Sequence, residues 1–449
     1  MSAIGRPIFC LRAGLISCRS IELWPMATFA RLLRTLPRYA QLTRSQYWSD
    51  DELRAWQDAR LGEVLSAAAK MPFYARRFGR DTPGARDFAQ LPILRRRDIA
   101  ELNRSVREQH RGEKLLTDWS SGSTGMPMEF IFDAGHQQGR FAARARYLRE
   151  NGWNPLGRTA WLVRLNFMTD TSDDSKLAGH RLFKIGNSLP NIDAFDEQFE
   201  WLIKCNPRYI YSFPSNLEGI LPFFEEQRVR LPTLRQIFTG AEVLDDTLRE
   251  RVETTMGARI ADNYGSTEAF LAWQCPRGSY HVNAEHVRIE IVGDDDAPVA
   301  AGVMGRVLAT TLENQVMPLI RYEIGDYAVA ASVSRCDCGR TLPMIGRVLG
   351  RGLNLFRASD GRLISPWPLV EPLKARPELR QFQLVQTALG SFLVRFTKAA
   401  AFEGEARSSV QSEFNRILGV PVSIDFQEVN EIQRSRAGKF MVALSELSD

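Results

Sequence analysis

The chain has few cysteines, little net charge and no long apolar run, and each shortage excludes a class of protein. Six cysteines among 449 residues are too few for a secreted disulfide framework. The 58 basic and 53 acidic side chains leave a net charge of only +5, and no element concentrates basic residues as nucleic-acid binders do. No apolar stretch reaches the roughly 18–20 residues of a membrane span. We therefore expect no nucleic-acid partner and no membrane span.

The composition is that of an ordinary globular protein, with 44% hydrophobic and 25% charged residues. A chain of this length can bury a sizeable core without disulfides or metals. We expect a cytoplasmic protein. Residues 1–40 are interpreted as a leader that need not be ordered, because the apolar run at the start is interrupted by Arg12 and lacks a clear cleavage site. Met26 is an alternative start.

Strands alternate with helices in the middle of the chain, which predicts βαβ units, a parallel sheet and an α/β fold. The expected strands include residues 209–211, 236–239 and 259–261, each a short apolar run. The expected helices between them cover residues 215–228 and 244–256. The sequence therefore predicts a large domain with mainly parallel sheets.

The pattern changes after about residue 280, where polar and apolar residues alternate as in half-exposed strands. We expect a β-rich subdomain over about residues 280–345. A stretch rich in glycine and arginine, residues 346–352, then marks a domain boundary. The predicted organisation is a large domain over residues 41–350 and a small, mobile α+β domain over residues 351–449.

A loop over residues 119–127 combines two glycines with several hydroxyl side chains. Backbone N–H groups and hydroxyls in such a loop can bind phosphate oxygens. No lysine follows the second glycine, so this is not a Walker A loop. The alternative is a flexible polar turn. The candidate phosphate-binding residues are Ser120, Ser121, Gly122, Ser123, Thr124 and Gly125.

A second polar segment, residues 262–268, directly follows the strand expected at residues 259–261. The carboxyl ends of strands in open α/β sheets are where ligands bind. A tyrosine can stack on a base, a threonine can hydrogen-bond a phosphate, and a glutamate can bind Mg²⁺. The alternative is an ordinary strand-to-helix turn. The candidates are Tyr264, Gly265, Ser266, Thr267 and Glu268.

Two later segments each place a charged residue directly after a glycine. Asp326 follows Gly325, and an acidic residue held in this way can accept the two hydroxyls of a ribose. Lys439 follows Gly438 and can deliver a mobile positive charge to a carboxylate or phosphate. The alternatives are a surface β-turn and a basic tail.

The order of these segments resembles the adenylate-forming superfamily of acyl-CoA synthetases, peptide-synthetase adenylation domains and luciferases. The resemblance covers residues 119–439, most of the chain. Cys338, Gly339 and Arg340 stand ahead of a Gly-Arg pair, and with the short length this is most similar to the phenylacetate–coenzyme A ligase-like and CapK-like branch.

The resemblance implies a role for each candidate. The hydroxyl loop would hold the β- and γ-phosphates of ATP, and Tyr264 would stack on adenine. Thr267 would contact the α-phosphate, and Glu268 would bind Mg²⁺. Asp326 would hold the ribose, and Lys439 would bridge the carboxylate and the α-phosphate. Further residues implied at the nucleotide site are Gly240, Ala241 and Glu242 at the edge of the adenine and acyl pockets, and either Arg347 or Arg351 beside the ribose.

The implied activity is ATP-dependent activation of a carboxylic acid as an acyl-adenylate, with release of pyrophosphate, followed by thioester formation with coenzyme A. One departure from the family puts the second step in doubt: Gly352, Leu353 and Asn354 stand where the hinge usually carries an Asp pair or a Lys. The alternatives are a hydroxyl or amine acceptor, adenylation of a cofactor, or a non-catalytic nucleotide-binding relative. The identity of the acid and the oligomeric state stay open.

Three cysteines and a histidine form a second group of interest: Cys275, His281, Cys336 and Cys338. Three thiolates and one imidazole make a closed, four-ligand structural zinc set. Relatives in the branch pair such groups as well, which supports zinc. The alternative is a set of unrelated thiols and a solvated histidine. Four protein ligands leave no open position, so a catalytic role for this metal is not expected.

Overall fold

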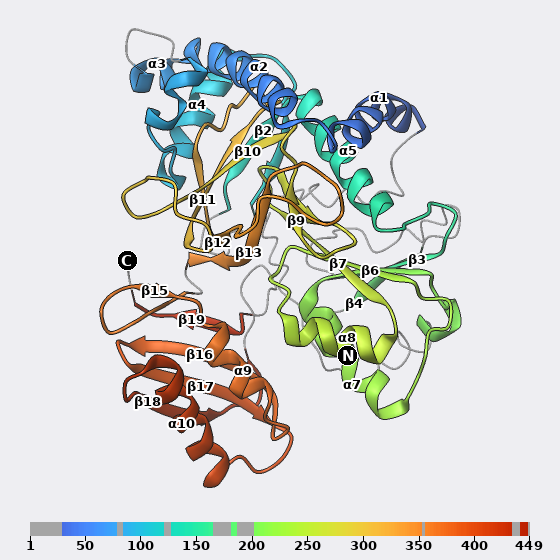
Figure 1. Ribbon diagram of the computed structural model, residues 1–449, viewed down its shortest axis with the longest axis vertical. Helices are drawn as coiled ribbons and strands as arrows, with labels where there is room; N and C mark the ends of the chain where they lie inside the picture. Colours follow the sequence, from blue (N-terminus) through green and yellow to red (C-terminus); the bar gives the residue numbers. More distant parts are fainter. Residues whose placement is uncertain are drawn as a thin grey trace, which may run out of the picture.

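The computed structural model describes residues 29–78, 84–120, 127–164, 181–185, 202–352, 355–432 and 441–447. Within these residues, eleven strands form one mixed sheet in the order β10-β11-β12-β13-β9-β8-β7-β6-β5-β3-β4 (Figure 1). Helices pack against this sheet, so the expected α/β class is confirmed. The strands are β3 (Thr159–Arg164), β4 (Arg181–Ile185), β5 (Tyr209–Ser212), β6 (Gln236–Gly240), β7 (Arg259–Gly265), β8 (Phe270–Gln274), β9 (Tyr280–Val282), β10 (Val287–Val292), β11 (Met304–Thr311), β12 (Tyr322–Ala330) and β13 (Met344–Arg351).

The helices of this part of the chain precede these strands in the sequence or lie between them. They are α1 (Phe29–Ser45), α2 (Asp50–Ala69), α3 (Pro72–Phe78), α4 (Ile99–Gln109), α5 (Ala134–Glu150), α7 (Pro214–Gln227) and α8 (Asp246–Met256), with two short 3₁₀ helices at Ala85–Gln90 and Arg96–Asp98. A hairpin of β1 (Leu116–Trp119) and β2 (Glu129–Phe132) carries the hydroxyl-rich loop. Figure 1 shows α2, α3 and α4 above the antiparallel strands, and α7 and α8 beside the parallel ones.

The sheet is parallel across β7, β6, β5, β3 and β4 and antiparallel across the remaining strands. The βαβ pattern therefore predicted the parallel half. The strands expected as a β-rich subdomain are present, but they continue the same sheet through β8 and β9. Residues 346–352, which we expected to form a domain boundary, lie mostly in strand β13, and this strand pairs with β12. The division of the chain near residue 350 stays a prediction.

Three local expectations need correction. Strand β7 runs on to Gly265 and turns into the antiparallel strand β8, so half of the segment 262–268 belongs to a strand and no helix follows it. Residues 29–40, expected within a leader, lie in α1, which packs against α5. His286, within the region expected to form half-exposed strands, lies one residue before β10 and is fully buried.

Helix α2 shows how the sequence sets an element boundary. Ser49 is its N-cap: the Ser49 hydroxyl accepts a hydrogen bond from the Glu52 N–H, and the Glu52 carboxylate accepts one from the Ser49 N–H. This capping box satisfies two N–H groups that the first turn would leave unpaired. Leu53, Leu61 and Leu65 then face the core, as the helical spacing in the sequence predicts.

The C-terminal residues form a smaller α+β unit. Its sheet has the order β18-β17-β16-β19, and Figure 1 shows it below the large sheet, in orange and red. Its elements are β14 (Phe356–Arg357), β15 (Leu363–Ile364), α9 (Trp367–Lys374), β16 (Leu379–Ala388), β17 (Ser391–Lys398), α10 (Glu405–Leu418), β18 (Ser423–Glu428) and β19 (Ala443–Ser445). Lys374 Nζ contacts Asp245 Oδ2 at 2.6 Å, which joins α9 to the N-cap of α8.

A fully buried ion pair holds α1 and α5 to the large sheet. Arg146 Nη1 lies 2.6 Å from Glu285 Oε1, and neither side chain is exposed to solvent. The Ser45 hydroxyl donates to the same carboxylate at 2.5 Å, and Arg146 also donates to the Asn283 side chain at 2.8 Å. Charges this far from water remain ionised only when each is paired and hydrogen-bonded. The pair therefore links three segments that are distant in sequence.

We predict that Arg146→Leu lowers the free energy of unfolding by about 3–5 kcal/mol, because it leaves the Glu285 carboxylate buried without its cation. Urea unfolding measures this loss. The matched control is Arg335→Ala, which breaks an exposed pair with Asp50 and should cost no more than about 1 kcal/mol. Equal losses in the two variants would contradict the importance of the buried pair.

Candidate active site

Three strands bring together a tyrosine and an arginine near strand ends and an aspartate in the middle of β12. Tyr264 near the end of β7 donates from its hydroxyl to Asp326 Oδ2 at 2.9 Å. Arg351 at the end of β13 lies with Nε 3.1 Å from Asp326 Oδ1 and donates through Nη1 to the Ile324 carbonyl at 2.8 Å. Asp326 is 8% exposed, so its carboxylate is held on both oxygens at a nearly buried position.

Gly325 allows this approach. It has φ of +86°, and a Cβ at that position would lie 3.1 Å from Arg351 Nη1. A side chain there would be strained by the backbone angle and would crowd the guanidinium. The Gly-Asp pair in the sequence therefore does have a structural reason, in strand β12 and not in a surface β-turn.

Electrostatics fix the protonation of Arg351 and Tyr264. The charge of Asp326, ahead of other effects, raises the pKa of Arg351, which stays a cation. Burial, followed by the charge of Asp326, raises the pKa of Tyr264 well above its usual range. The tyrosine therefore remains a neutral hydrogen-bond donor.

Glu268 lies in the bend between β7 and β8 and is only 3% exposed. Burial is the largest effect on its carboxyl group and raises its pKa, while a hydrogen bond with Ser266 and the charge of Arg351 oppose the shift. The bend is closed by Ser266 N–H donating to the Ala269 carbonyl at 2.9 Å. Thr267 beside it is half-buried. A buried carboxylate of this kind gains most from a cation, and oxygen is the ligand that Mg²⁺ prefers.

The expected edge of the adenine and acyl pockets, residues 240–242, follows the end of β6. A Cβ on Gly240 would lie 2.3 Å from the Asn263 amide nitrogen, so only glycine fits beside β7. Ala241 has φ of +67°, which turns the chain sharply. Glu242 accepts a hydrogen bond from the Ser215 N–H at 3.0 Å, at the start of α7.

Several predicted residues lie outside the described residues. They are Ser121, Gly122, Ser123, Thr124, Gly125, Leu353, Asn354 and Lys439. Ser120 is described: its N–H donates to the Met128 carbonyl at 2.8 Å, and its hydroxyl accepts from the Met128 N–H at 2.9 Å. Ser120 therefore closes the base of the β1–β2 loop.

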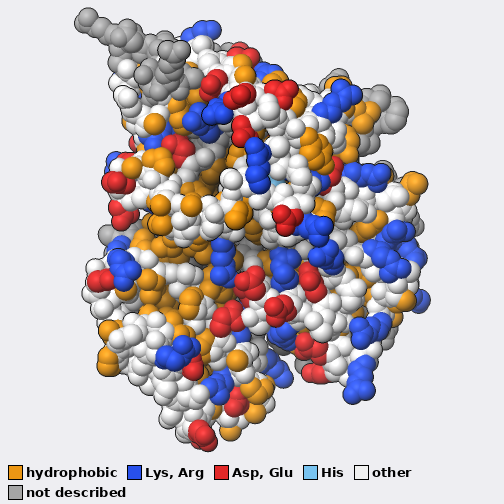
Figure 2. Space-filling model, in the orientation of Figure 1, with side chains coloured by type: hydrophobic (Ala, Val, Ile, Leu, Met, Phe, Trp, Pro, Cys, Tyr) orange, Lys and Arg blue, Asp and Glu red, His pale blue; other side chains and the backbone are white. Residues whose placement is uncertain are grey.

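The structure separates the two arginines left open by the sequence. Arg351 contacts Asp326, whereas Arg347 Nη2 lies 3.4 Å from Asp246 Oδ2 in an exposed pair at the start of α8. Figure 2 shows basic and acidic side chains mixed across the middle of this face, where Figure 1 places α8, α9 and β13. In this arrangement Arg351, and not Arg347, is beside the aspartate.

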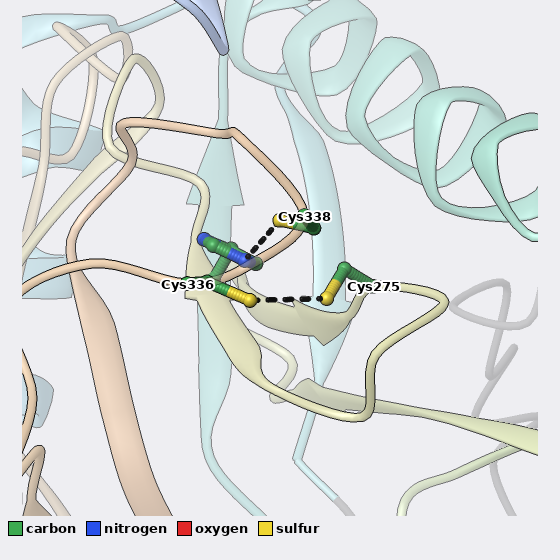
Figure 3. Close-up of side chains that lie close together, drawn as sticks. Cys275, Cys336 and Cys338 are labelled. Atoms are coloured by element: carbon green, nitrogen blue, oxygen red, sulfur yellow. Dashed lines mark hydrogen bonds between the residues drawn. The ribbon is translucent and has the colours of Figure 1, made fainter.

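The three cysteines and the histidine converge, away from this group. The possible ligand atoms of Cys275, His281, Cys336 and Cys338 all lie within 4.8 Å of one another. Figure 3 shows the three thiols pointing toward one another; Cys275 Sγ is 3.8 Å from Cys336 Sγ, and Cys338 Sγ is 3.2 Å from His281 Nε2. Two thiolates bound to one tetrahedral zinc at about 2.3 Å would be about 3.8 Å apart.

The surroundings of the cluster suit a metal ligand set. His281 Nδ1 lies 3.3 Å from the Leu342 carbonyl, which would orient Nε2 toward the thiols. Burial lowers the pKa of His281 to about 4, so its imidazole is neutral. The cluster joins the β8–β9 hairpin to the loop before β13. Because the geometry and the chemistry of the donors both fit, the residues present could hold a zinc ion.

Two residues near the site escaped the sequence analysis. His136 on α5 is fully buried, and its Nε2 lies 2.9 Å from the Glu268 carbonyl. Tyr322 at the start of β12 is buried close enough to Glu268 for the two to interact electrostatically. Neither belongs to a spacing pattern, because both reach the site through the packing of distant elements.

Comparison with known proteins places the fold in a class. The family model described as AMP-binding enzyme matches residues 176–318. A crystal structure of 2-hydroxyisobutyryl-CoA ligase in the postadenylation state superposes with a TM-score of 0.68 at 20% identity, covering 87% of this chain and 90% of that one. The chain therefore has the fold of the adenylate-forming ligases.

Curated relatives narrow the resemblance to one branch. The phenylacetate-coenzyme A ligase of Thermus thermophilus is 25% identical over 426 residues, 88% of this chain and 86% of that protein. Protein CapK of Staphylococcus aureus is 21% identical over 80% of each chain. The resemblance to the adenylate-forming superfamily, and within it to the phenylacetate–coenzyme A ligase-like and CapK-like branch, is confirmed. Among the described helices, none has the length and apolar character of a membrane span.

A buried carboxyl beneath the site makes stability depend on pH. Asp262 in β7 accepts hydrogen bonds from the Thr239 hydroxyl at 2.5 Å and from the Tyr280 hydroxyl. Burial outweighs these bonds and raises its pKa from 3.8 to about 6. Between these values the folded state binds more protons than the unfolded state, so this group reduces stability as pH rises through that window.

We predict that Asp262→Asn, which cannot ionise, removes this contribution. The unfolding free energy of the variant minus that of the wild type should increase by about 2 kcal/mol between pH 4 and pH 8, since each pKa unit corresponds to about 1.4 kcal/mol and part of the shift is already expressed at pH 4. Urea unfolding at the two pH values measures the difference. A difference that does not change with pH would contradict the raised pKa.

Proposed function

We propose that the protein is an ATP-dependent acid–coenzyme A ligase: it converts a carboxylic acid to an acyl-adenylate and then to a thioester. The observation that carries the proposal is the Tyr264–Asp326–Arg351 group beside Glu268, at the carboxyl end of β7. The match to AMP-binding enzymes and the names of the relatives support the same activity. The acid itself is not part of the proposal.

Asp326 is the proposed ribose site. One oxygen accepts a hydrogen bond from Tyr264 and the other faces the Arg351 guanidinium, and each retains a lone pair, so the carboxylate can accept the two ribose hydroxyls. Arg351 holds that carboxylate in place through the ion pair. The ring of Tyr264 would lie against the adenine, while its hydroxyl fixes the aspartate. Residues 240–242 would form the neighbouring edge of the pocket.

The other candidate residues would bind the phosphates and the metal. Glu268 would bind Mg²⁺, which would supply positive charge to the phosphates, and Thr267 would contact the α-phosphate. The loop from Ser120 to Gly125 would hold the β- and γ-phosphates. Lys439 would neutralise charge between the acid and the α-phosphate. The roles of the loop and of Lys439 rest on the sequence resemblance.

The chemistry needs no nucleophilic side chain. A carboxylate oxygen of the acid attacks the α-phosphorus, the bond to the bridging oxygen of the β-phosphate breaks, and pyrophosphate leaves. The coenzyme A thiolate then attacks the acyl carbon, and AMP leaves with the oxygen that came from the carboxylate. Two anions meet in the first step, so positive charge and fixed geometry provide the catalysis.

Pyrophosphate release with ATP and a panel of carboxylic acids tests the proposal. Release that depends on one of the acids, with a thioester formed when coenzyme A is added, is the expected result. If pyrophosphate release depends on the acid but the acyl group is transferred only to a hydroxyl or an amine, then that group, and not coenzyme A, is the acceptor. ATP binding without release for any acid would favour a non-catalytic nucleotide-binding protein.

We predict that Asp326→Ala weakens ATP binding about 10- to 100-fold, because it removes charge-assisted hydrogen bonds worth about 1.5–3 kcal/mol. Calorimetric titration with ATP measures the change. Asp246→Ala is the matched control: it removes an exposed carboxylate that also pairs with a β13 arginine, and its ATP affinity should equal that of the wild type. Unchanged affinity in Asp326→Ala would exclude the ribose role.

We also propose one structural zinc per chain, held by Cys275, His281, Cys336 and Cys338. Zinc would contribute folding free energy, since these ligands are dispersed in the unfolded chain. It would brace β9 and the loop before β13, and so help to place Arg351 at the end of that strand. All four ligand positions are protein atoms, which suits a structural role.

We predict that Cys338→Ser loses the metal and lowers the melting temperature, with activity reduced only through stability. Elemental analysis of the purified protein should find about one zinc per wild-type chain, the capacity of one four-ligand site. The control is Cys205→Ser, which changes a half-buried thiol outside the cluster and should retain the zinc. Metal-free wild-type protein with an unchanged melting temperature would rule out this role.

A further inference from the structure

A buried chain of side chains leads from α1 to the backbone of Glu268. His136 Nε2 lies 2.9 Å from the Glu268 carbonyl, and a carbonyl only accepts, so Nε2 carries the proton and donates. The His136 ring is stacked flat on Phe132, with centroids 4.9 Å apart and planes within 5°. On its other side the ring of His286 lies 4.6 Å away. The imidazole is therefore clamped in one orientation.

The far end of the chain is anchored by charge. His286 Nδ1 is hydrogen-bonded to the Glu313 carboxylate, and Glu313 pairs with Arg38 of α1. A Cβ on Gly139, one turn after His136, would lie 1.9 Å from the Glu313 carboxylate and 2.8 Å from His286. Only glycine allows the two groups to pack this closely against α5. The glycine in α5 therefore provides the space for the contact between His286 and Glu313.

The Glu268 carbonyl needs this donor. The β7–β8 pairing reaches Gly265 and Phe270, so residue 268 lies in the bend beyond the ladder. The bend itself is closed by hydrogen bonds between Ser266 and Ala269. A buried carbonyl left without a donor costs about 1–3 kcal/mol, which the bend can avoid by rotating its peptide. Because the carbonyl and the carboxylate share one Cα, such a rotation also moves the carboxylate.

We propose that His136 is a positioning residue that holds the Glu268 carboxylate at the proposed magnesium site, with His286, Glu313 and Arg38 bracing it. The inference rests on the proposed function, which assigns Mg²⁺ to Glu268. The donor is His136 Nε2, and the acceptor is the carbonyl of the residue whose carboxylate would bind the metal.

The test compares the Mg²⁺ dependence of acid-dependent pyrophosphate release among variants. His136→Leu removes the donor. The Mg²⁺ concentration at half-saturation should then rise about tenfold, because the loss of one hydrogen bond weakens the alignment of Glu268 by about the free energy of that bond. Release at saturating Mg²⁺ should recover. His136→Gln can place an amide N–H near the same point and should restore wild-type half-saturation. His136→Asn keeps an amide that is too short and should behave like His136→Leu.

Phe73→Leu is the matched control, because it also truncates a buried aromatic ring but leaves His136 and its neighbours unchanged. A merely structural role for His136 would lower the melting temperature of its variants and leave half-saturation by Mg²⁺ unchanged, and that result would overturn the inference. If His136→Leu does not fold, the contrast between the Gln and Asn variants decides.

Failure of the proposed function gives a different pattern. Wild-type protein that releases no pyrophosphate with any acid refutes the ligase activity, and the positioning role is then measured by calorimetry of ATP with and without Mg²⁺. Mg²⁺ should increase the affinity of the wild type and of His136→Gln for ATP, but not that of His136→Asn. This result would support the positioning role of His136. Equal gains in both variants, or no gain in the wild type, overturn it.

Discussion

The Asp326 carboxylate is the contact through which the sheet and the site depend on each other. It is nearly removed from water, so it must be paired, and its partners come from the ends of two other strands, Tyr264 of β7 and Arg351 of β13. That requirement fixes the middle of β12 relative to the ends of β7 and β13. The next strand along the chain, β14 of the C-terminal unit, begins at Phe356, so the contact lies close in sequence to that unit.

Much of the fold could be predicted from local sequence. The parallel strands appear as short apolar runs between amphipathic helices, and β7 was expected at residues 259–261, within its observed bounds. Its extension to Gly265 could not be predicted, because residues 262–264 are polar or aromatic and are buried by contacts from elsewhere, such as Thr239 and Tyr280 on Asp262. Tertiary hydrogen bonds, not strand propensity, satisfy these residues.

The candidate site was predictable where residue type alone limits the chemistry. Three thiols and an imidazole suggested a metal set before any geometry was known, and their ligand atoms lie together. The choice between Arg347 and Arg351 required the register of β13, in which irregular pairing with β12 sets where each arginine points. His136 left no sequence signal, since its function depends on a carbonyl 132 residues away.

The account rests on the formation of an acyl-adenylate, and isotope transfer tests that step most directly. A carboxylic acid that the protein accepts is labelled with ¹⁸O in its carboxyl group and incubated with ATP, Mg²⁺ and coenzyme A. Mass spectrometry of the nucleotide product should find one ¹⁸O atom in AMP, because the attacking carboxylate oxygen leaves with the α-phosphate. Unlabelled AMP, or ADP with the label in inorganic phosphate, would contradict the account.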